Sequence, residues 1–314
     1  MLMGRIASSE LTVGIIFLSQ TIIAILGNFS LLCQFLYYRE CRVRATDLIL
    51  KHLTISNSLV VLSKGVPQTM AALGLKHFLG DLACRLLLYA QRVGRGVSIG
   101  TTCLLSVFQA VRISPVNSCW KVKFPKYIGS SVSICWILYT FVNLIFPAYV
   151  FCVSGQWSSK NMTRKRDLGY CSYVDDEQIS GSVYAALIAF PEVSLSGLML
   201  WASGSMVLIL HRHKRRVRHI HSTNVSPRSS AESRATQRVL VLGSTFVCFY
   251  FLSSVFHAYL IYNPTWWLVN TCSLISVCFP TVSPYLLMSW GSTVPRLCFV
   301  WVRNMKSPPL SRRK

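Results

Sequence analysis

The chain has 314 residues, of which 52% are hydrophobic and only 13% are charged, and its mean hydropathy is +0.46. Because a soluble domain usually has about 25% charged residues, this composition excludes an ordinary soluble domain and indicates a membrane protein. The formal net charge of +22 would suggest a nucleic-acid partner. The basic residues gather between long apolar segments, however, which predicts a lipid bilayer as the partner and no nucleic acid.

The first two apolar segments, residues 11–36 and 47–74, are each longer than the roughly 20 residues that cross a bilayer. A short N-terminal segment without a signal-peptide cleavage site precedes the first, so this span is expected to serve as its own signal anchor. The second contains Asn57, Lys64 and Pro67. Polar groups at membrane depth predict that their side of the helix faces the bundle interior.

The third segment, residues 82–108, combines a membrane-length apolar run with charges deep inside it. Arg92 and Arg95 are three residues apart and therefore share one helical face. A charge near the bilayer centre costs about 2.5–3.5 kcal/mol or more on insertion scales, so both arginines are expected to face the bundle interior or a wet cavity. The alternative is that they reach outward to the lipid headgroups.

Four more spans follow the third. Residues 239–295 contain no Asp, Glu, Lys or Arg, and the turn signal Asn263-Pro264 divides this stretch into two helices. The fifth span of the chain holds one charge, Glu192, beside Pro191. The four predicted spans are 127–151, 182–210, 239–262 and 266–290. The sequence therefore predicts an all-α membrane protein, a single seven-transmembrane-helix domain covering residues 1–314.

The distribution of basic residues predicts the orientation of the chain. Most of the 32 lysines and arginines lie in the connections at 37–46, 109–126 and 211–238 and in the tail at 291–314. Because connections rich in these residues stay in the cytoplasm, the N-terminus is expected outside and the C-terminus inside, in a multi-pass protein of the plasma membrane. The composition of residues 211–238 leaves open whether they bind anionic lipid or a cytosolic partner.

Three N-glycosylation sequons begin at Asn28, Asn161 and Asn224. The first lies in a predicted span and the last on the cytoplasmic side, so only Asn161, in the long outer loop, is expected to carry a glycan.

Three of the 12 cysteines, Cys84, Cys152 and Cys171, are predicted on the oxidising side of the membrane. Three thiols cannot all pair with one another. A disulfide between Cys84 and Cys171 is favoured, because it would tie the outer loop over the top of the third helix.

The sequence shows no pattern typical of an enzyme. It has no phosphate-binding loop and no paired catalytic carboxylates, and the histidines between residues 211 and 221 lie in a basic run without zinc-site spacing. We therefore expect no catalytic activity, no cofactor and no metal. A transporter or channel is the alternative from another functional class, but the internal repeats or paired broken helices that would favour a transporter are not evident.

Four motifs in the sequence are long or distinctive enough to compare with known families. They are HLTISNSLVVLSKGVPQTMAALGL at 52–75, FQAVRISP at 108–115, FP at 190–191 and CFPTVSP at 278–284. All four resemble vomeronasal type-1 receptors, a family of pheromone receptors among the seven-helix G protein-coupled receptors. The resemblance extends over nearly the whole chain. It also separates this sequence from rhodopsin-like receptors in general, which have Asp-Arg-Tyr where this chain has Ala110-Val111-Arg112, and Asp and Asn-Pro where it has Asn57 and Ser283-Pro284.

The resemblance implies a chemosensory receptor that binds a small, pheromone-like ligand in the outer half of the bundle. It also implies activation of an inhibitory-class heterotrimeric G protein, with Arg112 at the coupling surface. A bitter-taste-type receptor is the nearest alternative within the receptor class.

Depth along the helices predicts which residues surround the ligand. At about 1.5 Å per residue, Arg92, Arg95, Glu192 and Lys64 come to a similar level near the middle of the membrane, and Gln91 adjoins them. We expect Glu192 to pair with Arg95 or Arg92, which would leave a net positive potential for an acidic or acceptor-bearing ligand. The alternative is a purely structural ion pair between the third and fifth helices.

Overall fold

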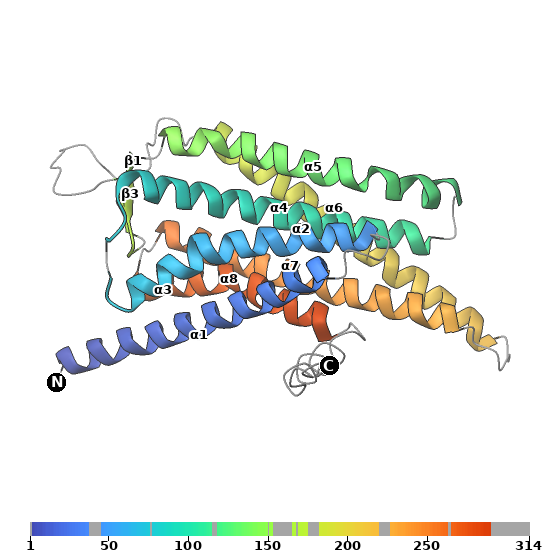
Figure 1. Cartoon of the computed structure of the whole chain (residues 1–314), viewed down its shortest axis with the longest axis horizontal. Coiled ribbons are helices and arrows are strands. Elements are labelled where there is room, and N and C mark those ends of the chain that lie inside the picture. The colour runs from blue at the N-terminus through green and yellow to red at the C-terminus, as the bar shows by residue number, and fades with distance from the viewer. Residues whose placement is uncertain are drawn as a thin grey trace, which may run out of the picture.

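The computed structural model, shown in Figure 1, is a bundle of long helices lying roughly side by side. It describes residues 2–37, 45–75, 77–114, 118–149, 151–152, 165–167, 169–174, 182–219, 227–262 and 265–289. Within those residues, six rods are single helices: α1 (Leu2–Tyr37), α4 (Asp81–Ile113), α5 (Ser118–Tyr149), α6 (Ser182–His219), α7 (Pro227–Tyr262) and α8 (Trp266–Ser289). The seventh rod is composite and consists of α2 (Ala45–Val60), the π-helical segment η2 (Val61–Gly65) and α3 (Val66–Ala72). The predicted seven-helix membrane architecture is thereby confirmed.

By length and hydropathy, six helices in the described part of the chain are long and apolar enough to cross a membrane. The composite rod does not meet this criterion because η2 divides it into two shorter α-helices. Its wider turn has a local cause in Pro67, whose ring would clash with the carbonyl of Ser63, four residues earlier, in a regular α-helix. The Val66 N–H instead donates to the Val61 carbonyl, five residues back, and the rod continues.

Helix α8 contains two prolines, and α1 compensates for one of them. Pro284 has no N–H to donate to the carbonyl of Pro280. The side-chain amide of Asn28 in α1 donates to that carbonyl instead, at 2.9 Å. Tyr285 adds a second link, because its hydroxyl donates to the Ile23 carbonyl at 2.8 Å. The asparagine that the sequence placed inside the first span therefore joins α1 to the proline-containing part of α8.

Helix α4 is the most buried of the candidate spans and packs against α2, α5, α6 and α7. Two of its glycines permit a close approach to α5. A Cβ atom at Gly96 would collide with the ring of Tyr139, and one at Gly100 would collide with the Sγ of Cys135. Large apolar side chains such as Phe141 are exposed on the outside of the bundle, as expected for a surface that faces lipid.

A small antiparallel sheet at one end of the bundle adds strands to the helical architecture. Its strands are β1 (Phe151–Cys152), β2 (Lys165–Asp167) and β3 (Ser172–Val174), in the order β1-β3-β2. The N-terminus of the chain lies toward the same end (Figure 1).

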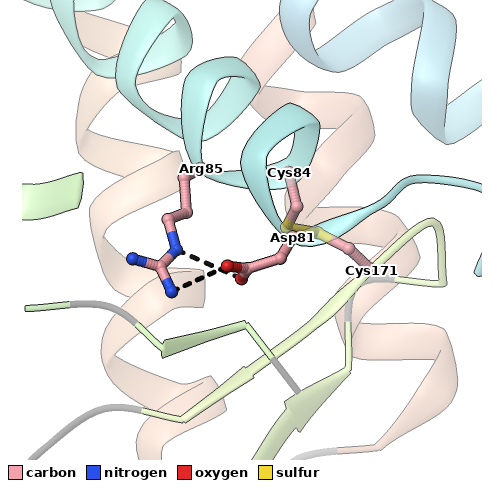
Figure 2. Close-up of a disulfide and its surroundings, with 4 residues drawn as sticks. All are labelled: Asp81, Cys84, Arg85 and Cys171. Atoms are coloured by element: carbon pink, nitrogen blue, oxygen red, sulfur yellow. Dashed lines mark hydrogen bonds and ion pairs between the residues drawn. A yellow bond between two sulfur atoms is a disulfide. The ribbon is translucent and has the colours of Figure 1, made fainter. Parts of the chain in front are cut away.

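A disulfide fastens the segment before β3 to the bundle. Figure 2 shows Cys171 joined to Cys84 in the first turn of α4, with a Cα–Cα distance of 6.2 Å. Tyr170 beside it is only 1% exposed, and it packs with Ala71 and Leu88 in a small apolar cluster around the disulfide. The loop is therefore held by packed side chains as well as by the covalent bond.

Candidate ligand-binding site

A cavity of about 40 Å³ lies between α2, α4, α7 and α8. Polar groups line one part of it and aromatic rings another. The lining residues are Val60, Gln91, Arg95, Ser98, Phe246, Phe249, Tyr250, Ser253, Ile275, Ser276, Phe279 and Pro280. Pockets for drug-sized ligands usually measure about 300–1,000 Å³, so a ligand of that size requires lining side chains to move.

The aromatic wall follows from the helical period of α7. Phe246, Phe249, Tyr250 and Ser253 recur at spacings of three and four residues, which place them on one face of the helix. Phe246 stacks with Tyr250 at a centroid distance of 6.0 Å and contacts the edge of Phe279 in α8 at 4.7 Å. These ring contacts fix the orientation of the wall that closes the cavity on the α7 side.

Tyr250 connects the cavity to Glu192, the acidic residue predicted within the fifth span. Its hydroxyl donates to Glu192 Oε2 in α6 at 2.5 Å, and the guanidinium of Arg95 in α4 lies over its ring, 5.0 Å from the centroid. Glu192 was expected to pair with Arg95 or Arg92; in the described part of the chain it accepts the hydrogen bond of Tyr250, and no ion pair joins it to Arg95. Helical rise predicts the depth of a residue but not the direction of its side chain, and the ring of Tyr250 lies against both charged groups.

Lys64 lies one helical turn outward from Val60, on the same face, and is only 6% exposed. It is close enough to Arg95 and to Cys272 of α8 to interact with both electrostatically. Among the residues that the structure describes, Lys64 has neither a carboxylate partner nor a hydrogen bond. It does not itself line the cavity, whereas Val60, one turn before it, and Arg95 do.

A further turn outward, the composite rod and α8 meet through two amides. The Gln68 Nε2 donates to Asn270 Oδ1 at 3.3 Å. The Gln68 Oε1 is buried without a hydrogen-bond partner in the described part of the chain. This pair of amides lies on the outer side of Lys64.

Of the five residues predicted to bind ligand, the structure places Gln91 and Arg95 in the lining of the cavity. Lys64 is adjacent, and Glu192 is connected to the lining through Tyr250. Arg92 is half-buried and is not a lining residue. The aromatic and serine residues of the lining were missed, although the spacing of Phe246, Phe249, Tyr250 and Ser253 along one helix face could have indicated them.

A series of buried, hydrogen-bonded polar side chains extends from the cavity toward the end of the bundle opposite the small sheet. Ser98, which lines the cavity, donates to Asn57 Oδ1 at 2.9 Å. Asn57 donates from Nδ2 to the hydroxyl of Ser283, also at 2.9 Å. These two bonds join α4, α2 and α8 immediately before Pro284. The sequence identified Asn57 and Ser283 as departures from the rhodopsin-like pattern, and the structure shows that they bond to each other.

Arg112 is exposed in the last turn of α4, about 25 Å from Arg95 along the helix at the standard rise. The helix ends there, and the Ser114 N–H donates to the Ala110 carbonyl at 3.0 Å. Asn161, the predicted glycosylation site, lies outside the described residues. Cys152 lies in β1, paired with Tyr173 of β3.

Comparison with known proteins identifies the family. The model of the vomeronasal organ pheromone receptor family matches residues 11–300. Human vomeronasal type-1 receptor 4 is 53% identical over 304 residues, which cover 95% of this chain and 100% of that receptor. Human vomeronasal type-1 receptor 2 is 53% identical over 294 residues, 91% of this chain and 74% of that receptor. Zebrafish (Danio rerio) olfactory receptor class A-like protein 1 is 30% identical over 292 residues, 88% of each chain. The chain therefore belongs to the vomeronasal type-1 receptor family and is a multi-pass, chemosensory G protein-coupled receptor rather than an enzyme.

Proposed function

We propose that this receptor binds a small pheromone-like ligand in the cavity between α2, α4, α7 and α8 and activates an inhibitory-class heterotrimeric G protein. The observation that carries the ligand site is the position of Arg95. This arginine lines the cavity, contacts the ring of Tyr250 and has no carboxylate partner among the described residues. Gln91 lines the cavity with it, while Lys64, Arg92 and Glu192 complete the polar region.

Ligand binding shifts an equilibrium between conformations only if the ligand binds one of them more tightly. A ligand that displaces the Tyr250 ring from Arg95 also disturbs the hydrogen bond between Tyr250 and Glu192, which joins α7 to α6. These two helices continue well past the predicted spans, to His219 in α6 and from Pro227 in α7. A change in their relative position at the cavity therefore reaches the end of the bundle where we place the G protein, next to Arg112.

The test is nucleotide exchange in a defined system. Purified receptor in lipid nanodiscs is combined with an inhibitory-class G protein, and binding of GTPγS is measured while panels of volatile, steroidal and acidic compounds are applied. We expect at least one active compound, no response with a stimulatory-class G protein, and loss of the response in Arg95→Ala. Substrate flux in proteoliposomes without any nucleotide exchange would instead indicate a transporter.

We also propose that the end of the bundle with the small sheet faces the outside of the cell. The distribution of basic residues and the Cys84–Cys171 disulfide support this orientation, because disulfides persist in oxidising compartments. A glycosidase-sensitive change in electrophoretic mobility should disappear in Asn161→Gln and remain in Asn224→Gln. A glycan at Asn224 would reverse the proposed orientation.

A further inference from the structure

Two tyrosine hydroxyls lie near Glu192 of α6, and only one of them bonds to it. Tyr250 of α7 donates to Glu192 Oε2. Tyr139 of α5 is close enough to interact electrostatically with both Glu192 and Tyr250. Its hydroxyl is buried and has no hydrogen-bond partner among the residues that the structure describes. Because a carboxylate has two oxygens and can accept several hydrogen bonds, Glu192 can accept from either tyrosine.

Helix α4 determines where the Tyr139 ring lies. A Cβ atom at Gly96 would collide with this ring, so the ring fills the space that the glycine leaves open. Only 5% of Tyr139 is exposed. The ring packs with Val97 of α4, and Leu195 of α6 packs against the same cluster. The hydroxyl therefore cannot reach bulk water while the ring stays against Gly96, and a partner for it has to come from the protein or from an enclosed water molecule.

Two more buried polar atoms without a partner in the described part of the chain lie one helical turn from these residues. Asn143 follows Tyr139 by one turn of α5, and its Nδ2 donates to the Tyr139 carbonyl at 2.7 Å while its Oδ1 is unpartnered. Ser196 follows Glu192 by one turn of α6, and its Oγ is unpartnered. Side chains four positions apart share a helix face. One face of α5 and one face of α6 thus carry complementary donors and acceptors that do not bond to each other.

We propose that Glu192 exchanges its hydrogen bond from Tyr250 for one from Tyr139, and that the described structure is one of two packings of α6. In the described packing, Tyr250 joins α6 to α7. In the other packing, Tyr139 joins α6 to α5, and the Ser196 hydroxyl comes within reach of Asn143 Oδ1. The exchange replaces one tyrosine–carboxylate bond by another of the same kind, and it gives partners to groups that otherwise lack them. Both packings are therefore accessible, as in other interfaces with two discrete arrangements.

The consequence of this exchange for signalling rests on the proposed function. A ligand that displaces the Tyr250 ring removes the donor on which the described packing depends, and Tyr139 is then the alternative donor to Glu192. Helix α6 moves away from α7 toward α5, and it extends to His219 at the end where we place the G protein. The Tyr250–Glu192 bond thereby holds the ligand-free receptor inactive. Tyr139, which does not line the cavity, is a positioning residue for α6.

Thermal unfolding of the purified receptor in nanodiscs tests the exchange without a ligand or a G protein. Tyr139→Phe keeps the ring against Gly96 and removes only the hydroxyl. In the wild type we expect it to raise the unfolding midpoint slightly, because a buried donor without a partner is removed. In a Tyr250→Phe background, where Glu192 depends on Tyr139, the same substitution should lower the midpoint by at least about 2 °C. When Glu192→Leu also removes the acceptor, Tyr139→Phe should raise the midpoint again.

Tyr127→Phe is the matched control, because this tyrosine is exposed on the same helix α5, and its substitution should shift the midpoint in neither background. A lower midpoint for Tyr139→Phe in the wild type would show that its hydroxyl already has a partner, such as an enclosed water, and would overturn the inference. Equal effects of Tyr139→Phe in the wild type and in Tyr250→Phe would overturn it as well, because Glu192 would then not change donors.

Nucleotide exchange separates the inference from the proposed function. With an inhibitory-class G protein and no ligand, we expect GTPγS binding to rise at least about fivefold in Tyr250→Phe and to return to the wild-type level when Tyr139→Phe is added. If the midpoints change as expected but no variant alters GTPγS binding, the exchange of donors stands and the proposed coupling fails. If compounds stimulate GTPγS binding while the midpoint shifts of the two tyrosine variants simply add, the proposed function stands and the inference is overturned.

Discussion

Removing the hydroxyl of Tyr250 tests whether this residue joins α6 to α7. Tyr250→Phe keeps the ring under Arg95 and against Phe246 but removes the donor to Glu192. Hydrogen bonds to charged groups contribute about 1.5–3 kcal/mol, and the carboxylate left behind is half-buried. We therefore expect the free energy of unfolding to fall by about 1.5–3 kcal/mol.

A double-mutant cycle with Glu192→Gln makes the test specific. Unfolding by SDS in mixed micelles gives the free energies of the wild type, both single variants and the double variant. We expect a coupling energy of at least about 1 kcal/mol between the two positions. Tyr259→Phe is the matched control, because this tyrosine is exposed on the same helix, and its substitution should have almost no effect. A coupling energy below about 0.5 kcal/mol would mean that the two side chains act independently, and that Tyr250 is not the connection between the helices.

Three further sets of substitutions test the disulfide, the signalling surface and the helix packing. Cys84→Ser and Cys171→Ser should each reduce surface expression to a similar degree, and a clearly larger loss in the double variant would contradict the pairing. Arg112→Ala should reach the surface normally but activate the G protein about tenfold less, through loss of one charged hydrogen bond in the active state; unchanged activation at matched expression would make the position a simple membrane anchor. Gly96→Ala should destabilise the protein by about 1–3 kcal/mol in SDS unfolding, because the new methyl group collides with Tyr139. Gly197→Ala, where a Cβ atom meets nothing within 4 Å, should be neutral or slightly stabilising, and equal losses at both glycines would contradict the packing argument.

The seven-helix architecture could be predicted because a bilayer imposes a minimum length on every apolar segment. Charged residues in the connections then separated most spans from one another. The uncharged turn signal Asn263-Pro264 separated the last two. The same reasoning identified Asn28 as a polar residue inside the first span, but not its partner. That partner is a carbonyl of α8 freed by Pro284, and a contact between helices so distant in sequence depends on how they are packed.

The candidate site was predictable only in its charged residues and the adjoining Gln91. An arginine or a carboxylate inside a span is conspicuous because it is unfavourable there, whereas Phe246, Phe249 and Phe279 resemble any lipid-facing residue. Of the two expected pairings of Glu192, with Arg95 or with Arg92, the one with Arg95 is absent among the described residues for a related reason. Depth came from counting residues, but the direction of each side chain depends on the rotation of its helix, and Tyr250 occupies the position between the two charges.

The π-helical segment η2 holds about one residue more than a regular α-helical turn would. Deleting one residue between 61 and 65 would restore α-helical hydrogen bonding and leave the residues beyond it facing nearly the same way, because the π-helical turn holds about one residue more than the α-helical turn that would replace it. Gln68 would therefore keep its side toward Asn270 of α8, and Asn57, before the segment, would keep its bonds to Ser98 and Ser283. A single deletion in η2 can thus shorten the helix by one residue without turning its outer part, whereas the same deletion in a regular α-helix would rotate everything beyond it by about 100°.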